Sequence, residues 1–307
     1  MTLYVVPCGV SARDGLTRKR GLVADSSTRP LLVQSLRWAV QARATRDEKT
    51  VVAAWRDGLV EAIDEADLMN GEPELAAETS TVASRAASLA TLVADGHRVV
   101  LLASDTDEGL ASAMVVATRL SRDVGRLRYC CVPAELTLAT WPYRFDEGTV
   151  TVVRVLGLDP RAPDGLRNAT AGIGRVLRAA YETAAGDSVE VHLTGGLKFT
   201  LLHIMTMTEV LGALPGADVS AWYLFDDDPG HPQAVRIDMR RLSEEYVAVL
   251  RDELRAVRDR SATGGRAFEG YGWVEEHGRR TLNAFGTGFL TVLGEPAATF
   301  GDDGVRS

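Results

Sequence analysis

The sequence predicts an α/β protein with a Rossmann-like, mostly parallel and doubly wound sheet, followed by a small C-terminal module. The first observation is a series of short apolar runs such as HRVVLLAS at 97–104, which is typical of strands buried on both faces. The second is that these runs alternate with segments whose apolar residues recur at helical spacing. This order predicts parallel strands joined by helices, and such sheets bind ligands beyond the carboxyl ends of their strands.

The first part of the chain is predicted to hold one strand and three helices. The strand LYVVPCGV at 3–10 leads into SARDGLTRKRG, a polar and arginine-rich stretch that is typical of a loop. Apolar residues then recur at three and four along the helices expected at 29–44, 51–69 and 73–96.

From residue 97 onward, strands and helices alternate. Strands are expected at 97–104, 126–133, 150–158, 189–196 and 219–228, and helices at 107–125, 165–186 and 198–214. The first of these helices has Asp107 and Glu108 in its first turn and Gly125 at its end, which suits the helix dipole and the usual C-terminal cap.

The last part of the chain has a different character. An amphipathic helix is expected at 239–259, a glycine-containing break at 261–272, and a short hairpin with a final helix at 273–294. The sequence therefore predicts a sheet domain at 1–238, a small winged-helix-like module at 239–294, and a disordered tail at 295–307.

Composition limits the classes of function. A net charge of −8 and a pI of about 5.3 argue against a broadly basic surface for duplex DNA, although a small anion in a local basic pocket stays compatible. The three cysteines have neither a disulfide framework nor zinc spacing. The N-terminus lacks the basic region of a signal peptide, and no stretch has the length of a membrane span. We therefore expect a cytoplasmic protein.

One lysine stands out in a chain that otherwise uses arginine. Lys occurs only at Lys19, Lys49 and Lys198, against 31 arginines. Lys198 follows a Thr-Gly-Gly turn, and its compact ammonium can act as a point charge where a planar guanidinium does so poorly.

Three segments lie where a predicted strand gives way to a loop or helix: GVSAR at 9–13, SDTDEG at 104–109 and TGGLK at 194–198. Glycines let backbone N–H groups approach a ligand, and a helix N-terminus favours negative charge, so the pattern suits a phosphate-bearing ligand. The dinucleotide motif G-x-G-x-x-G and the P-loop motif are absent. Taken singly, TGGLK is typical of a helix-entry turn, Ser11 of a loop hydroxyl and Glu78 of a solvated helix residue.

In combination, these segments resemble the CRISPR-associated Rossmann-fold (CARF) family, whose members sense cyclic oligoadenylates made during type III CRISPR immunity. The similarity rests on four segments: PCGVS at 7–11, AAETS around Glu78, LLASDTDEG at 101–109 and HLTGGLK at 192–198. It extends over about residues 3–240. The chain departs from the family pattern at His192, where Asn is usual, at Leu197, where Phe is usual, and in its longer, more basic loop after Ser11.

The resemblance implies a homodimer with a cyclic tetra-adenylate lying across its two-fold axis, without a metal or cofactor. The residues that it places at the ligand are Gly9, Val10, Ser11, Ala12, Arg13, Glu78, Ser104, Asp105, Thr106, Thr194, Gly195, Gly196 and Lys198. Matching positions in CARF ring nucleases give Lys198 and Ser11 the catalytic roles. A ring nuclease cleaves the cyclic oligoadenylate in this pocket through attack by a ribose 2′-OH.

Two other functions stay open. The chain is compatible with a non-catalytic sensor whose C-terminal module binds DNA or a protein, and with a CARF-controlled effector ribonuclease. None of the five histidines follows an arginine at the spacing of a HEPN ribonuclease, and DEK at 47–49 is expected to be surface charge. Residues 239–280 carry nine arginines and eight acids, which is too balanced for a strong DNA-binding surface.

Overall fold

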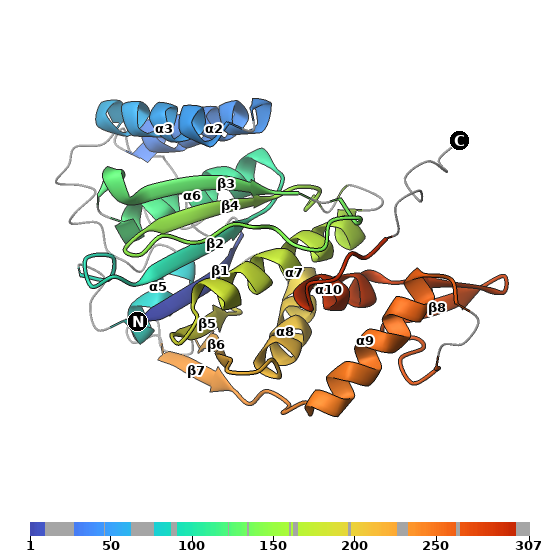
Figure 1. Ribbon diagram of the computed structural model, residues 1–307. Coiled ribbons are helices and arrows are strands. Elements are labelled where there is room, and N and C mark those ends of the chain that lie inside the picture. Colours follow the sequence, from blue (N-terminus) through green and yellow to red (C-terminus); the bar gives the residue numbers. More distant parts are fainter. Residues whose placement is uncertain are drawn as a thin grey trace.

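A computed structural model describes twelve parts of the chain: 1–9, 28–45, 47–62, 77–86, 91–121, 123–133, 135–159, 161, 165–195, 198–225, 233–261 and 265–298. These form a seven-stranded sheet with helices on both faces, which confirms the Rossmann-like α/β class (Figure 1). Six neighbouring strands are parallel, and the edge strand β7 is antiparallel.

The strand order is β3-β4-β2-β1-β5-β6-β7. The strands are β1 (Thr2–Cys8), β2 (Arg98–Ala103), β3 (Leu127–Val132), β4 (Val150–Val155), β5 (Ser188–His192), β6 (Asp218–Phe225) and β7 (Gln233–Ile237). Every predicted strand is present, whereas β7 was not predicted. Because β7 is an edge strand with mostly exposed residues, it lacks the apolar run that identifies the others.

Strand β1 shows why the apolar runs are continuous. Leu3 and Val5 belong to the core on one face of the sheet, and Tyr4, Val6 and Cys8 to the core on the other. Since both faces are covered, every position of the strand after Thr2 is apolar or aromatic. The first face is covered by α7 (Gly165–Thr183), α8 (Lys198–Gly212) and α10 (Ala284–Val292), and the second by α2 (Thr28–Ala44), α3 (Glu48–Ala62), α5 (Ala77–Arg85) and α6 (Asp107–Ser121).

The helices on the second face of the sheet begin and end close to the predicted positions, with some differences. Helix α3 begins one residue after Asp47, whose carboxylate accepts the Thr50 N–H at 3.0 Å, so the DEK segment starts a helix. The predicted helix began at 51, and its residues 63–69 lie outside the described residues. Of the helix predicted at 73–96, the structure has α5 and a turn at 91–96. A short 3₁₀ turn, η2 (Val124–Arg126), follows α6.

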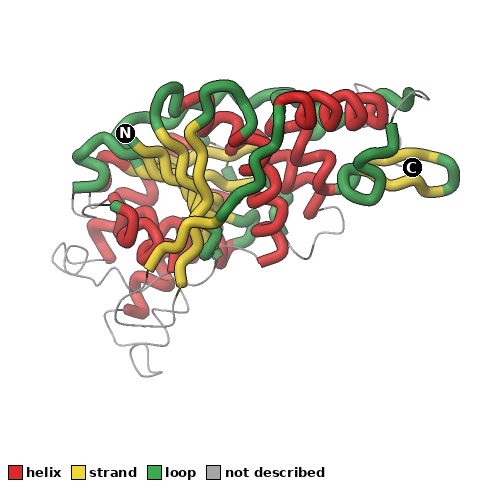
Figure 2. The backbone as a smooth tube through the Cα atoms, turned by 90° about the horizontal axis from the view of Figure 1, so that it is seen from below, coloured by secondary structure: helices red, strands yellow, loops and turns green. Residues whose placement is uncertain are grey.

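The C-terminal elements are the predicted ones: α9 (Glu244–Arg258), the hairpin β8 (Trp273–Glu276) and β9 (Arg279–Leu282), and α10. The hairpin lies at the end of the molecule away from the sheet (Figure 2). Leu250, Trp273 and Phe289 nevertheless belong to the same core as Val5 of β1. A Cβ at Gly174 of α7 would lie 2.1 Å from Thr291 Oγ1 of α10, so these helices pack very closely.

One prediction about this region needs correction, whereas the winged-helix-like character of residues 239–294 stays a prediction. Residues 295–298, placed in a disordered tail, are packed: the N–H groups of Ala297 and Ala298 both donate to Leu136 O, and Glu295 pairs with Arg255. The rest of the predicted tail, 299–307, lies outside the described residues.

Candidate functional site

The three predicted ligand segments follow strands that are neighbours in the sheet. β1 lies between β2 and β5, and all three run parallel, so their carboxyl ends share one edge. Cys8 pairs with Ala103, which brings Gly9 level with Ser104. On the other side, β1 pairs with β5 from Thr2 and Ser188 to Val5 and Val191, and β5 ends three residues before Gly195. The segments that contain Gly9, Ser104 and Gly195 thus follow adjacent strands at the same edge of the sheet.

This edge is also where the connections diverge. The helices after β1 and β2 cover one face of the sheet, and α8, which follows β5, covers the other. In open α/β sheets, the gap between strands whose connections leave toward opposite faces is the usual ligand crevice. The β1–β5 boundary is that position here.

The SDTDEG segment is a compact turn that begins α6. Ser104 Oγ lies 2.9 Å from Thr106 Oγ1, which accepts the Gly109 N–H at 3.1 Å and so caps the helix. A Cβ at Gly109 would lie 1.9 Å from Ser104 Oγ, so the glycine is required for this packing. The Ser104 hydroxyl is consequently held inside the turn.

Asp105 has a structural set of partners. Its carboxylate accepts hydrogen bonds from Arg154 Nε at 2.7 Å and from the Gly157 N–H at 2.9 Å, and Arg43 lies 3.7 Å away. These contacts tie the end of β2 to the end of β4 and balance the negative charge of Asp105. Asp105 therefore adds little repulsion toward an anion at this edge.

The TGGLK segment joins β5 to α8. Thr194 Oγ1 accepts the Leu224 N–H of β6 at 2.8 Å, which anchors the turn. Lys198 is the first residue of α8 and is exposed, and the first turn of α8 contains no acid, in contrast to that of α6. A cation at a helix N-terminus is disfavoured by the helix dipole by a few tenths of a kcal/mol to about 1 kcal/mol. A bound anion would remove this penalty, so the placement of Lys198 suits an anionic ligand.

The other predicted site residues are described less fully. Val10, Ser11, Ala12, Arg13 and Gly196 lie outside the described residues, and Glu78 is in α5 without a described side chain.

A buried polar cluster that includes His192 lies beside the candidate edge. The His192 side chain is 0% exposed, and neither ring nitrogen has a hydrogen-bond partner in the part of the chain that the structure describes. Its Nε2 lies 3.6 Å from Glu190 Oε2, and its ring meets the Tyr4 ring edge-on at 5.6 Å. Burial lowers the pKa of His192, which favours the neutral imidazole.

Arg85 completes this cluster from α5. Its guanidinium donates two hydrogen bonds to the Glu190 carboxylate and lies 3.7 Å from the centre of the Trp222 ring. α5 is thereby tied to β5 and β6. The sequence pattern gave no signal for this contact, since Arg85 and Glu190 are 105 residues apart.

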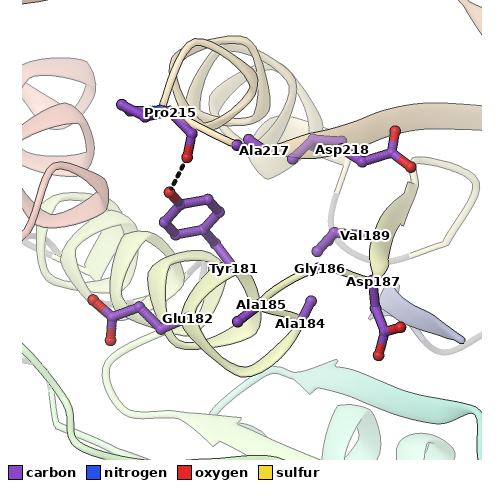
Figure 3. Close-up of a pocket in the computed structure, with 12 residues that line it drawn as sticks. Tyr181, Glu182, Ala184, Ala185, Gly186, Asp187, Val189, Pro215, Ala217 and Asp218 are labelled. Carbon is purple, nitrogen blue, oxygen red and sulfur yellow. Dashed lines mark hydrogen bonds between the residues drawn. The ribbon is translucent and has the colours of Figure 1, made fainter.

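A cavity of about 270 Å³ lies at the opposite, amino-terminal edge of β5 and β6. Figure 3 shows Tyr181 beside this cavity, with its hydroxyl donating to Pro215 O at 2.8 Å. Asp187 in its wall pairs with the Met1 ammonium at 2.8 Å and with Arg98 at 3.1 Å. These contacts balance the charge of Asp187, and none of the predicted site residues lines this cavity.

Within the described ranges, no three His, Cys, Asp or Glu side chains are grouped as a metal site. The helices described there include none long and apolar enough to cross a membrane. Neither a protein-family model nor a curated protein sequence matches the chain.

Proposed function

We propose that the protein binds a cyclic oligoadenylate, with cyclic tetra-adenylate as the favoured ring, at the carboxyl edge of β1, β2 and β5, and that it cleaves this ligand as a CARF ring nuclease. The observation that carries the proposal is that the segments with Gly9, Ser104 and Gly195 follow three adjacent parallel strands at one edge of the sheet, where Lys198 starts α8. Two copies related by a two-fold axis would match a two-fold symmetric ligand.

The binding step rests on charge and backbone geometry. The first turn of α8 carries Lys198 and no acid, so the positive end of the helix dipole and an ammonium lie at the same end of the helix. The charge of Asp105 is balanced by Arg154. The edge is thus suited to the phosphates of a ligand even though the whole chain has a net charge of −8.

The chemical step needs no metal. A ribose 2′-oxygen attacks the adjacent phosphorus in line while the bond from phosphorus to the 5′-oxygen breaks. The 2′-OH loses its proton, the departing 5′-oxygen gains one, and the products end in a 2′,3′-cyclic phosphate and a 5′-OH. Lys198 would stabilise the charge on the non-bridging oxygens of the phosphorane, and Ser11 would orient the 2′-OH.

Incubation of the purified protein with cyclic tetra- and hexa-adenylate in EDTA, followed by chromatography, tests the proposal. Linear products ending in a 2′,3′-cyclic phosphate are expected. Binding without cleavage would favour the non-catalytic sensor, and absence of binding to either ring would refute the CARF assignment.

A further inference from the structure

A second cavity lies far from the candidate site. Its volume is about 580 Å³, and it is bounded by the C-terminal part of α8, the end of β7, the segment 238–243 and the start of α9. Figure 1 shows the segment from β7 to α9 passing the lower end of α8. Lys198 is at the other end of this 15-residue helix, about 20 Å away at 1.5 Å per residue.

One wall of the cavity is a fixed ion pair. Glu209 is 6% exposed, and its carboxylate accepts hydrogen bonds from the Arg240 N–H at 3.1 Å and from Arg240 Nε at 2.9 Å. Arg240 also donates to the Tyr271 hydroxyl at 3.4 Å. Glu209 and Arg240 therefore neutralise each other and hold the segment after β7 against α8.

The remaining charges of the cavity are available. In the described part of the chain, no ion pair or side-chain hydrogen bond is found for Arg236 and Arg241, and the same holds for the side chains of Asp238 and Glu244; all four residues are exposed. A guanidinium is suited to a phosphate because its donors match two oxygens at once. A carboxylate is suited to sugar hydroxyls, as in the dinucleotide-binding folds.

Apolar side chains complete the lining. Ile237, Met239 and Leu242 are partly buried and face the same cavity. The cavity thus offers cationic, hydroxyl-accepting and apolar surfaces within a volume that is typical of small-molecule sites. An inorganic anion would use only the first of these surfaces.

We propose that this cavity binds a small organic phosphate that also carries hydroxyl groups and an apolar part, of which a nucleoside monophosphate is the simplest example. Arg236 and Arg241 would bind the phosphate, Asp238 and Glu244 the hydroxyls, and Met239 with its apolar neighbours the base. The site is separate from the carboxyl edge, so this proposal does not depend on the proposed function.

The test is calorimetric titration with AMP, ribose 5-phosphate and inorganic phosphate. AMP is expected to bind most tightly, and Arg236→Gln and Arg241→Gln should each weaken it about tenfold or more, as the loss of charge-assisted hydrogen bonds predicts. Arg279→Gln is the matched control, because Arg279 is an exposed arginine of β9 outside the cavity. Lys198→Ala should leave the AMP affinity unchanged.

Three results would overturn the proposal. They are no AMP binding at millimolar concentration, AMP binding that both arginine variants retain, and phosphate binding as tight as AMP binding. Loss of AMP binding in Lys198→Ala would also overturn it, since the nucleotide would then occupy the carboxyl edge.

Discussion

The guanidinium of Arg85 donates two hydrogen bonds to the carboxylate of Glu190, from Nη2 to Oε1 at 2.9 Å and from Nε to Oε2 at 3.2 Å. This pair joins α5 to β5, the strand that leads into the Thr194–Lys198 turn. The Arg85 side chain is about one-third exposed, whereas that of Glu190 is 10% exposed. Removing the arginine would therefore leave a largely buried carboxylate without its counter-charge.

We expect Arg85→Met to lower the free energy of unfolding by about 2 kcal/mol, less than for a fully buried pair because Arg85 is partly solvated. Arg85→Lys should cost less, since it keeps the charge but loses the paired hydrogen bonds. Urea denaturation measures both. Arg161→Met is the control, because the solvent-exposed Arg161 pairs with Asp159 at the surface, where ion pairs contribute little to stability. Equal losses in Arg85→Met and Arg161→Met would contradict the structural role of Arg85.

His192 predicts a pH dependence of stability. Its pKa in the folded protein is lowered from 6.5, mainly by burial, although Glu190 opposes this shift. The unfolded chain therefore binds the proton more readily than the folded protein. The contribution of His192 to the free energy of unfolding is fully present above about pH 6.5 and falls as the pH drops toward the folded pKa. Tyr4, Glu190 and Arg85 face the imidazole, and Glu190 itself has a lowered pKa, so its own contribution is lost only at more acidic pH.

His192→Asn should remove the part of the pH dependence of the free energy of unfolding that His192 causes. The measurement is the free energy of unfolding of both proteins in urea at pH 8, 6.5 and 5.5. The free energy of unfolding of wild type minus that of the variant should decrease toward pH 5.5, whichever protein is more stable at pH 8. A difference that stays constant over the three pH values would show that His192 does not titrate differently on folding.

Replacement of the buried Arg175 is expected to lower the free energy of unfolding strongly, because it removes hydrogen bonds to backbone carbonyls. This guanidinium is 1% exposed and donates to the carbonyls of Pro133, Glu135 and Leu138. Burial lowers its pKa to about 10. Arg175→Met would remove these hydrogen bonds and leave Glu135 O with only the Leu138 N–H, so we expect a loss of about 3 kcal/mol and faster amide exchange around residue 136.

Arg178→Met is the matched control on the same helix. Arg178 pairs with Glu182 one turn away at 2.6 Å, near the surface of α7. Such helix pairs contribute about 0.2–0.5 kcal/mol. If the two variants unfold at the same urea concentration, the carbonyl cluster around Arg175 is not a stabilising feature.

The sequence predicted those features that depend on local pattern. The parallel strands were predicted mainly from their apolar runs, although β5 alternates valines with Ser188, Glu190 and His192. The position of Lys198 at the start of α8 followed from the glycine turn before it. The structure adds that β2, β1 and β5 are adjacent and parallel, so the three predicted segments follow strands that end at one edge.

Features that depend on distant contacts were not predicted. Arg154, 49 residues away, donates to the Asp105 carboxylate, and the place of Asp105 at the ligand stays a prediction. The Arg85–Glu190 pair and the buried imidazole of His192 have no sequence period to signal them. The C-terminal elements were expected to be a separate module, but α10 shares a core with α7 and α8, since close packing of Gly174 and Gly288 is not visible in a hydrophobic pattern.

In the proposed mechanism, Lys198 stabilises charge that develops only during cleavage. The most direct test of this role is the single-turnover rate of cyclic tetra-adenylate cleavage in EDTA with saturating protein, compared among wild type, Lys198→Ala, Lys198→Arg and the control Lys49→Ala. Lys49 is an exposed lysine of α3, so its removal should leave the rate unchanged. We predict that Lys198→Ala lowers the rate about a hundredfold or more, comparable to the loss of an oxyanion donor at about 3 kcal/mol, while affinity falls much less. Lys198→Arg should fall between the two, because its charge is spread over a larger planar group. Wild-type cleavage that persists undiminished in Lys198→Ala would contradict the catalytic role of Lys198.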